Sequence, residues 1–296
     1  MPYALYGEAR RLRYFFLICS ELLKKSPISE QNFHLLLGES FRNINYKLEY
    51  HVRSTGILQT SPVAKNYLSY CKWLDLFIKE GKIIMTNGNT IFFANICDDS
   101  SFKLSDLEKI SMFILIAKNE LFIELLSSLK PSSSPKDFVP KIGDEHLVET
   151  LLEWCVDFDI LLSASKKFGT YKVNYKFSNL IKNIDKYNLN EIIRLYCSYV
   201  LNVNILLNRK LDETLVWNQI ILSLNKTKKY TRSEIDNNLY SALPFLLDLQ
   251  AHLILKYQTF YSFDSLINIV QKIALSFNSF FTWNYMKHGG QIKIGV

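Results

Sequence analysis

Glycine and proline are scarce in this chain of 296 residues, with 10 and 7 copies respectively. Because both residues interrupt regular structure, their scarcity favours helices over long loops. No apolar run reaches the roughly 20 uninterrupted residues that a membrane-spanning helix needs. The two most apolar windows, 110–126 and 239–255, are both broken by polar residues. The run from Tyr14 to Cys19 is too short for a secretion signal and lacks a small-residue cleavage site.

Cysteine is rare as well, and its five copies stand far apart, at Cys19, Cys71, Cys97, Cys155 and Cys197. No two of them have the spacing of zinc ligands, and an odd number cannot all pair within one chain. We therefore expect a cytoplasmic protein with free thiols and no metal. The sequence also lacks a glycine-rich phosphate loop, an HExxH pattern and a GxSxG pattern, and its five histidines stand alone. These absences predict no catalytic residues, no cofactor and no enzymatic activity.

The composition is that of a soluble globular protein, with 48% apolar and 21% charged residues. The length allows two or three small domains, each with its own core. The scarcity of glycine and proline, together with the abundance of Tyr and Phe, predicts a mainly α fold. A net charge of +7 mildly favours an anionic partner.

The stretch from Ser61 to Phe93 has the clearest local signals. Ser61 and Pro62 suit the start of a helix that we expect to end at Glu80, just before Gly81. The helix would bury one face, made by Tyr67, Cys71, Leu74 and Ile78. Asn87-Gly88 between the apolar runs 82–86 and 89–93 predicts a two-residue hairpin.

A helix that runs directly into a two-stranded hairpin resembles the end of a winged helix-turn-helix domain. Two earlier helices, at 8–25 and from the Ser29 cap through Leu37, match the order of such a module. The resemblance rests on element order and one hairpin and covers residues 1–97. It implies that the helix before the hairpin enters the major groove of DNA while the hairpin reaches the backbone or the minor groove.

The resemblance also implies which side chains contact DNA. Carried onto this sequence, the contacts come from the helix and from the hairpin tip: Lys65, Asn66, Ser69 and Lys72, and Asn87 and Asn89. Lysines on one helical face can neutralise phosphates, and Asn can read adenine. The alternative is that the lysines only keep a surface helix soluble, because the same helix carries Asp75, Glu80 and the apolar Leu76.

Further basic groups are candidates for nucleic-acid contacts. They are Lys166 with Lys167, and Lys228 with Lys229 and Arg232, where Tyr230 offers a ring for base stacking. A run like the second group is more often a solvated loop ahead of a capped helix, and we favour that interpretation of it. In the first helix we expect Arg10, Arg11 and Arg13 to point outward.

We predict that the segment 130–136 is a linker and that it marks a domain boundary. We expect a helical connector over 98–130 that starts with a Ser105–Glu108 capping box. A candidate second winged-helix-like module follows over 137–185, with a helix at 145–159 and strands at 160–163 and 170–175. The comparison of 74–78 with 156–160 suggests a repeat, although two amphipathic helices can match by chance. Residues 186–296 are predicted as a helical C-terminal domain whose end, 280–296, has the alternation of two strands around Gly289-Gly290.

Two functional hypotheses follow. The first is a DNA-binding protein without catalysis, whose C-terminal region dimerises or docks a partner. The second is a protein-interaction subunit of a larger prokaryotic assembly, such as an antiviral defence or nucleic-acid-processing complex. The second hypothesis rests on the high aromatic content, 14%, and on the weak chemistry of the groove-facing helix. Fold alone does not separate the two.

Overall fold

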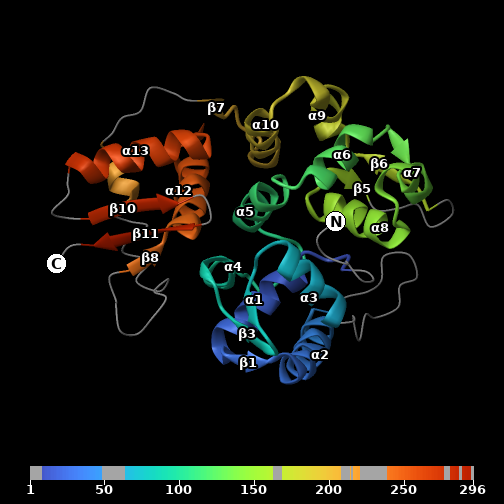
Figure 1. The fold of residues 1–296 in the computed structure, drawn as a ribbon. Coiled ribbons are helices and arrows are strands. Elements are labelled where there is room, and N and C mark those ends of the chain that lie inside the picture. Colours follow the sequence, from blue (N-terminus) through green and yellow to red (C-terminus); the bar gives the residue numbers. More distant parts are fainter. Residues whose placement is uncertain are drawn as a thin grey trace.

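The computed structural model shows a mainly α-helical protein with small sheets of two or three strands (Figure 1). It describes residues 9–48, 64–162, 169–207, 214, 216–220, 239–276, 281–286 and 289–294, and the structural statements below refer to these residues. Most elements belong to three small units, defined as module 1 (13–85), module 2 (120–173) and module 3 (239–294). In Figure 1 the modules, coloured blue, green and orange to red, lie around helix α5.

Module 1 is built from three helices and a three-stranded antiparallel sheet. Its elements are α1 (Arg13–Lys25), β1 (Ile28–Ser29), α2 (Glu30–Lys47), α3 (Ala64–Trp73), β2 (Ile78–Glu80) and β3 (Ile83–Met85). Strand β3 lies in the middle of the sheet and pairs with both β1 and β2. Ser29 ends β1 and caps α2, because its side chain accepts a hydrogen bond from the backbone N–H of Asn32.

Module 2 repeats this order. Its elements are α6 (Glu120–Ser128), β4 (Ser132–Ser133), η1 (Pro135–Asp137), α7 (Val139–Ile142), α8 (Glu145–Asp157), β5 (Leu161–Leu162) and β6 (Tyr171–Val173). The short segments η1 and α7 stand in the place of the long helix α2. The last strand, β6, is again central and pairs with β4 and β5. The helix at 145–157 and the two hairpin strands lie where the sequence predicts them. The segment 130–136 is no linker, because it contributes β4 to this sheet.

Module 3 has the same strand order a third time. It contains β8 (Leu239–Ser241), α12 (Ala242–Tyr257), α13 (Phe263–Ser276), β10 (Phe281–Met286) and β11 (Gly289–Ile294). The sheet order is β10-β11-β8, with the last strand in the middle. The C-terminal region is therefore not helical alone. Both final strands were predicted, but Gly289 and Gly290 belong to β11 and pair with β10 instead of forming the turn.

One sequence pattern opens all three modules. At the end of the first strand or just after it stands a serine, followed by phenylalanine four residues later and by leucine or isoleucine eight residues later. The positions are Ser29, Phe33 and Leu37, then Ser134, Phe138 and Ile142, then Ser241, Phe245 and Leu249. In modules 1 and 3 this serine also pairs with the central strand, Ser29 with Ile83 and Ser241 with Gln291. In module 2 the residue before it, Ser133, pairs with Tyr171. The pattern therefore marks the step from the first strand to the following helical segment in all three modules.

Modules 1 and 2 also share the turn between helix and hairpin. Asp75 and Asp159 both have left-handed backbone conformations, with φ of 52° and 61°. In each case the next N–H donates back to a cysteine carbonyl at 2.8 Å, from Leu76 to Cys71 and from Ile160 to Cys155. After the hairpin, the side-chain amides of Asn87 and Asn174 each donate to the aspartate carbonyl at 2.9 Å.

The remaining elements join the modules. They are α4 (Gly88–Asn95), α5 (Asp106–Ile116), η2 (Tyr175–Phe177), α9 (Ser178–Lys182), η3 (Ile184–Lys186), α10 (Leu189–Leu201), β7 (Leu206–Leu207) and β9 (Thr259–Phe260). Helix α12 packs on α4 and α5, and β7 pairs with β9 in parallel. The capping box of Ser105 and Glu108 at the start of α5 is confirmed. Buried apolar side chains of all these parts form one continuous core.

The predicted hairpin at Asn87-Gly88 is wrong. The hairpin lies one strand earlier and turns at Gly81, whose φ is +58°. Asn87 instead caps α4 in a capping box with Thr90. A strand would turn alternate side chains away from the core, whereas Ile91, Phe92 and Phe93 are all buried in α4. Helix α4 packs between α1 and α12, and this burial decides its conformation.

Two expectations about helices also need correction. The helix before the hairpin ends at Trp73 instead of Glu80, because Asp75 adopts the left-handed conformation; Ser61 and Pro62 lie outside the described residues. The arginines of the first helix do not all point outward. Arg13 is fully buried and pairs with the equally buried Glu108, and only 7% of Arg11 is exposed.

Candidate nucleic-acid interface

The outward face of α3 brings together four predicted contact residues. Lys65, Ser69 and Lys72 follow one another at four and three positions, so they share a face, and Asn66 lies beside them. Both lysines are exposed, while Ser69 and Asn66 are half-buried. The Ser69 hydroxyl donates to the Asn66 carbonyl at 2.7 Å, which keeps it close to its own helix. The face thus offers two cations with polar groups between them.

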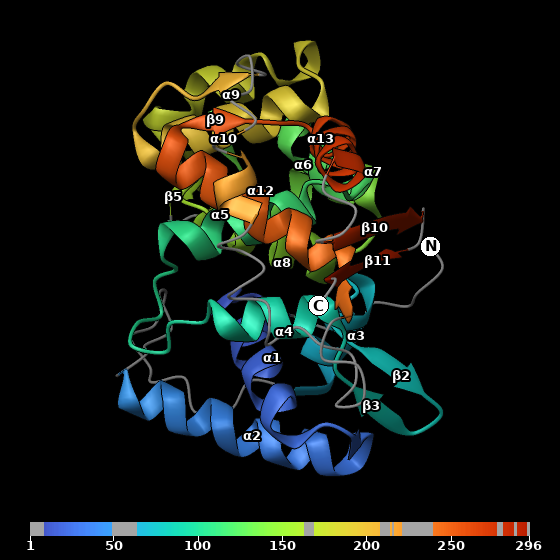
Figure 2. The same ribbon diagram turned by 90° about the vertical axis from the view of Figure 1, so that its left-hand side faces the viewer.

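The β2–β3 hairpin follows α3 and projects from module 1 (Figure 2). Lys79, Glu80 and Lys82 are exposed around the turn at Gly81. Lys79 is paired with Glu30 at 2.7 Å, so its charge is partly compensated. Lys82 was missed by the sequence analysis, which placed it inside a strand. Gly81 between the apolar runs 76–78 and 83–85 is the signal that could have identified this turn.

Asn87 and Asn89 do not lie at the hairpin tip. Both are buried, with 8% and 3% of their surfaces exposed. Their side-chain amides both donate to the carbonyl of Asp75 at 2.9 Å. They hold the left-handed turn after α3 and are therefore structural residues, which corrects the sequence expectation for these two positions.

The other predicted basic residues lie outside the described part of the chain. They are Lys166 and Lys167, and Lys228, Lys229 and Arg232.

Module 2 offers a direct comparison with the α3 face. Counting back from the matching cysteines, Glu149, Glu153 and Val156 of α8 occupy the places of Lys65, Ser69 and Lys72. The basic face of α3 is therefore replaced by an acidic and apolar one. Glu149 accepts from Arg10 at 2.5 Å, and Glu153 accepts from the hydroxyl of Tyr171 at 2.8 Å.

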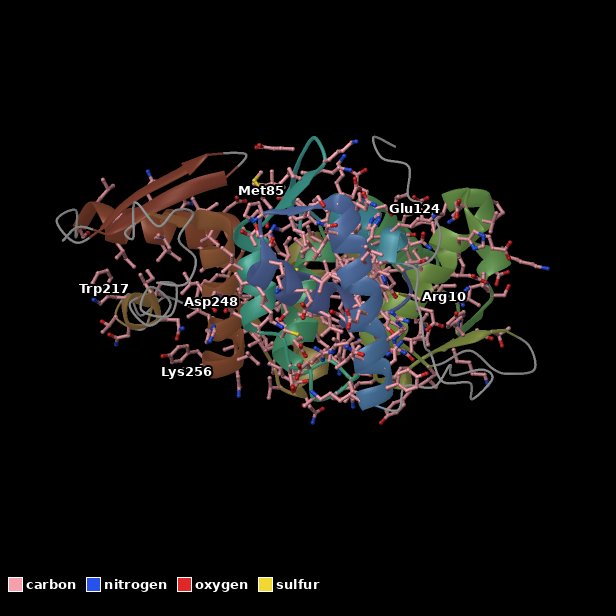
Figure 3. All side chains as sticks on the ribbon, turned by 90° about the horizontal axis from the view of Figure 1, so that it is seen from below. Arg10, Met85, Glu124, Trp217, Asp248 and Lys256 are labelled. Carbon is pink, nitrogen blue, oxygen red and sulfur yellow. The ribbon has the colours of Figure 1, made fainter. Side chains whose placement is uncertain are left out.

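The N-terminal segment 9–12 covers α8. Ala9 N–H donates to Thr150 at 3.3 Å, and the Trp154 ring N–H donates to the Ala9 carbonyl at 2.8 Å. Asp157 binds both the Leu12 N–H and Arg11, each at 2.8 Å. Figure 3 shows Arg10 beside the green helices of module 2. Helix α8 thus uses its polar groups inside the protein.

Module 3 presents a third version of the face on α13. The buried Val270, Ile273 and Ala274 repeat the spacing of the buried Tyr67, Tyr70 and Cys71 of α3. On this match the exposed Asn268, Lys272 and Leu275 occupy the places of Lys65, Ser69 and Lys72. Leu275 is 73% exposed. Helix α13 therefore combines polar groups and one cation with an apolar end.

Four of the five cysteines are buried, and Cys97 is half-buried. Burial raises the pKa of the Cys71 and Cys155 thiols, which keeps them protonated, and raises that of Cys97 to about 11. Within the described ranges, no three His, Cys, Asp or Glu residues come together in a way that could hold a metal ion. No helix in the same ranges is long and apolar enough to span a membrane.

Comparison with known proteins adds no relative: no family model, no curated protein and no solved structure matches this chain.

Proposed function

We propose that this protein binds nucleic acid without catalysis and contacts duplex DNA through the α3 face and the β2–β3 hairpin. Module 1 has a helix, α3, followed by the β2–β3 hairpin, which lies one strand earlier than the hairpin on which the resemblance to a winged-helix domain is based. In that resemblance the helix enters the major groove and the hairpin reaches the backbone. Lys65, Lys72 and Lys82 would then contact phosphates, and Asn66 would contact a base.

The observation that carries the proposal is the difference among the three matching helices. Only α3 has two lysines on this face, with a polar position between them. The same face of α8 carries Glu149 and Glu153, whose negative charges would repel phosphates. The surrounding sequence agrees, because residues 1–97 contain 12 Lys and Arg against 7 Asp and Glu. The free thiols of all five cysteines fit the proposed cytoplasmic location.

The test is a titration of a labelled random duplex by fluorescence anisotropy at salt concentrations from about 50 to about 200 mM. We expect micromolar or tighter binding at the lowest salt. The double variant K65A/K72A should bind more weakly and lower the slope of log K against log salt by about 2, because each phosphate contact contributes roughly 0.9.

A matched control is K136A/K141A, which removes two exposed lysines from module 2. It should keep both the affinity and the salt slope. Equal losses in the two double variants would show that only general positive charge matters, and the absence of any binding at low salt would refute the proposal for the isolated protein.

A protein-docking role is the second candidate, and it is favoured by Leu275. This leucine is 73% exposed on α13, at the position where α3 has Lys72. Such a side chain on an outward helical face suits an apolar partner surface, including a second copy of this chain. Light scattering coupled to gel filtration would test dimerisation: L275Q should convert a dimer to a monomer, whereas a monomeric wild-type protein would exclude the homodimer.

A further inference from the structure

The segment 172–186, from β6 to η3, has a distinctive charge pattern. It contains the four lysines Lys172, Lys176, Lys182 and Lys186 and a single acidic residue, Asp185. Three of these lysines are exposed, and Lys176 is half-buried. None of the four forms an ion pair within the described structure. This differs from Lys24, Lys79 and Lys109, which all pair with carboxylates. The segment therefore presents uncompensated positive charge.

Tyr175 lies among these lysines in the sequence. It is 89% exposed, the largest exposed fraction among the large apolar side chains described. The neighbouring aromatic residues behave differently, because Tyr171 and Phe177 are buried. Asn174 anchors the backbone here: its side chain donates to the Asp159 carbonyl at 2.9 Å and accepts from the Lys176 N–H at 3.2 Å. An anchored turn thus presents an aromatic ring that packs on no other ring of the described residues.

Module 1 shows that the repeated architecture does not require this exposure. Asn87 corresponds to Asn174, and the residue after it, Gly88, is buried at the start of α4. Met85 stands where module 2 has Lys172, two positions before the asparagine. After this asparagine, the chain of module 1 therefore enters the core, whereas the chain of module 2 forms a basic and aromatic surface.

Lys172 points away from the core of module 2. Its neighbours across the sheet, Ser132 on β4 and Leu162 on β5, are exposed as well. Tyr175 follows Lys172 by three positions, which limits the distance between their Cα atoms to about 11 Å. The long lysine side chain can therefore reach a phosphate beside a base that stacks on Tyr175. Lys176, next to the ring, can reach another.

We propose that the segment 172–186 binds single-stranded nucleic acid, with a base stacked on Tyr175 and phosphates held by Lys172 and Lys176. Sequence-independent binding of single strands combines these two features, an aromatic platform and a basic track. Duplex DNA does not suit the site, since its bases already stack on each other and offer no free face. The inference rests on the proposed nucleic-acid-binding function but uses a different surface.

The test compares labelled oligo(dT) with a labelled random duplex for the full-length protein. Y175A should weaken oligo(dT) binding about tenfold, because one stacked base contributes a factor of this order. Y175W should bind as tightly as wild type or more tightly. K172A/K176A should lower the salt slope for oligo(dT) by about 1.4, since each phosphate contact on a single strand contributes roughly 0.7. All three variants should keep the duplex affinity.

The matched control is Y46A, which removes another exposed tyrosine, on α2, and should leave oligo(dT) binding unchanged. Unchanged binding in Y175A, or equal losses in Y175A and Y46A, overturns the inference. The two proposals fail separately. Duplex binding that depends on Lys65 and Lys72, without a Tyr175 effect on oligo(dT), overturns only this inference. The converse result overturns only the duplex proposal, and binding to neither ligand overturns both.

Discussion

Modules 1 and 2 have the same framework but opposite surfaces. The cysteine and aspartate of the turn and the asparagine after the hairpin occupy matching places in both. In each module the asparagine side chain satisfies the aspartate carbonyl, which the fold would otherwise leave unpaired. Such positions tolerate little change. The outward positions of α3 and α8 differ, because Lys65 and Ser69 are matched by Glu149 and Glu153.

The helix before the hairpin has a different role in each of these two modules. In module 2 the helix before the hairpin is a docking surface for segment 9–12, which fixes the two modules to each other. In module 1 the matching helix exposes Lys65 and Lys72. Arg13 of α1 and Glu108 of α5 form a buried ion pair, so removing either partner would leave the other charge buried and unpaired. We infer that module 2 holds module 1 in place.

The largest effect should come from the junction of the two modules. Trp154 is fully buried, and its ring lies 5.5 Å from that of Phe15 and 5.6 Å from that of Tyr70. W154A should lower the free energy of unfolding by about 3–5 kcal/mol, since it removes a large side chain from a packed core. Urea denaturation measures this value. The matched variant W73A, at a half-buried tryptophan, should cost clearly less; equal costs would contradict the junction described here.

A smaller difference should separate the two matching asparagines. N87A should destabilise the protein by about 1–2 kcal/mol, because Asn87 caps the long, buried helix α4. N174A should cost less, about 0.5–1 kcal/mol, because Asn174 is half-buried and caps only the short turn η2. Thermal and urea unfolding of both variants would show the order, and a larger loss in N174A would reverse our interpretation of the two turns.

The smallest effect should come from giving α8 the charge of α3. E149K/E153S places a lysine and a serine where α3 has Lys65 and Ser69. We expect duplex affinity to change less than about twofold, because segment 9–12 continues to cover this face through Thr150, Trp154 and Asp157. Anisotropy at low salt provides the measurement. A large gain in affinity would show that charge alone, without accessibility, distinguishes the modules.

Local patterns predicted much of the fold. The mainly α class is confirmed, as are the capping box at Ser105 and both hairpins of modules 2 and 3 as pairs of strands. These features depend on residues close in sequence. Asn87-Gly88 shows the limit, because asparagine suits a hairpin turn and a helix cap equally well. Burial of Ile91–Phe93 against helices that are distant in sequence determines that Asn87 caps a helix instead of forming a hairpin turn.

Long-range contacts explain the other differences. Arg13 looks like a surface residue until Glu108, 95 positions later, is placed beside it. The repeat between modules 1 and 2 was suspected, but 74–78 matches 158–162 and not 156–160. Two aspartates, Asp157 and Asp159, stand close together, and only the left-handed backbone of Asp159 identifies the one that corresponds to Asp75. For the candidate site, the helical spacing of the lysines predicted the α3 face. The exposure of Tyr175 could not be predicted in this way, because it depends on the tertiary fold.

DNA binding by the α3 face is tested most directly by the triple variant K65E/S69E/K72V. This variant gives α3 the side chains that α8 has at the matching positions. All three positions are exposed or half-buried, so the melting temperature should stay close to that of the wild type. We predict that duplex affinity at low salt falls more than about tenfold, since two phosphate contacts are lost and two repulsive charges are added. Wild-type duplex affinity in this folded variant would contradict the assignment of DNA binding to the α3 face.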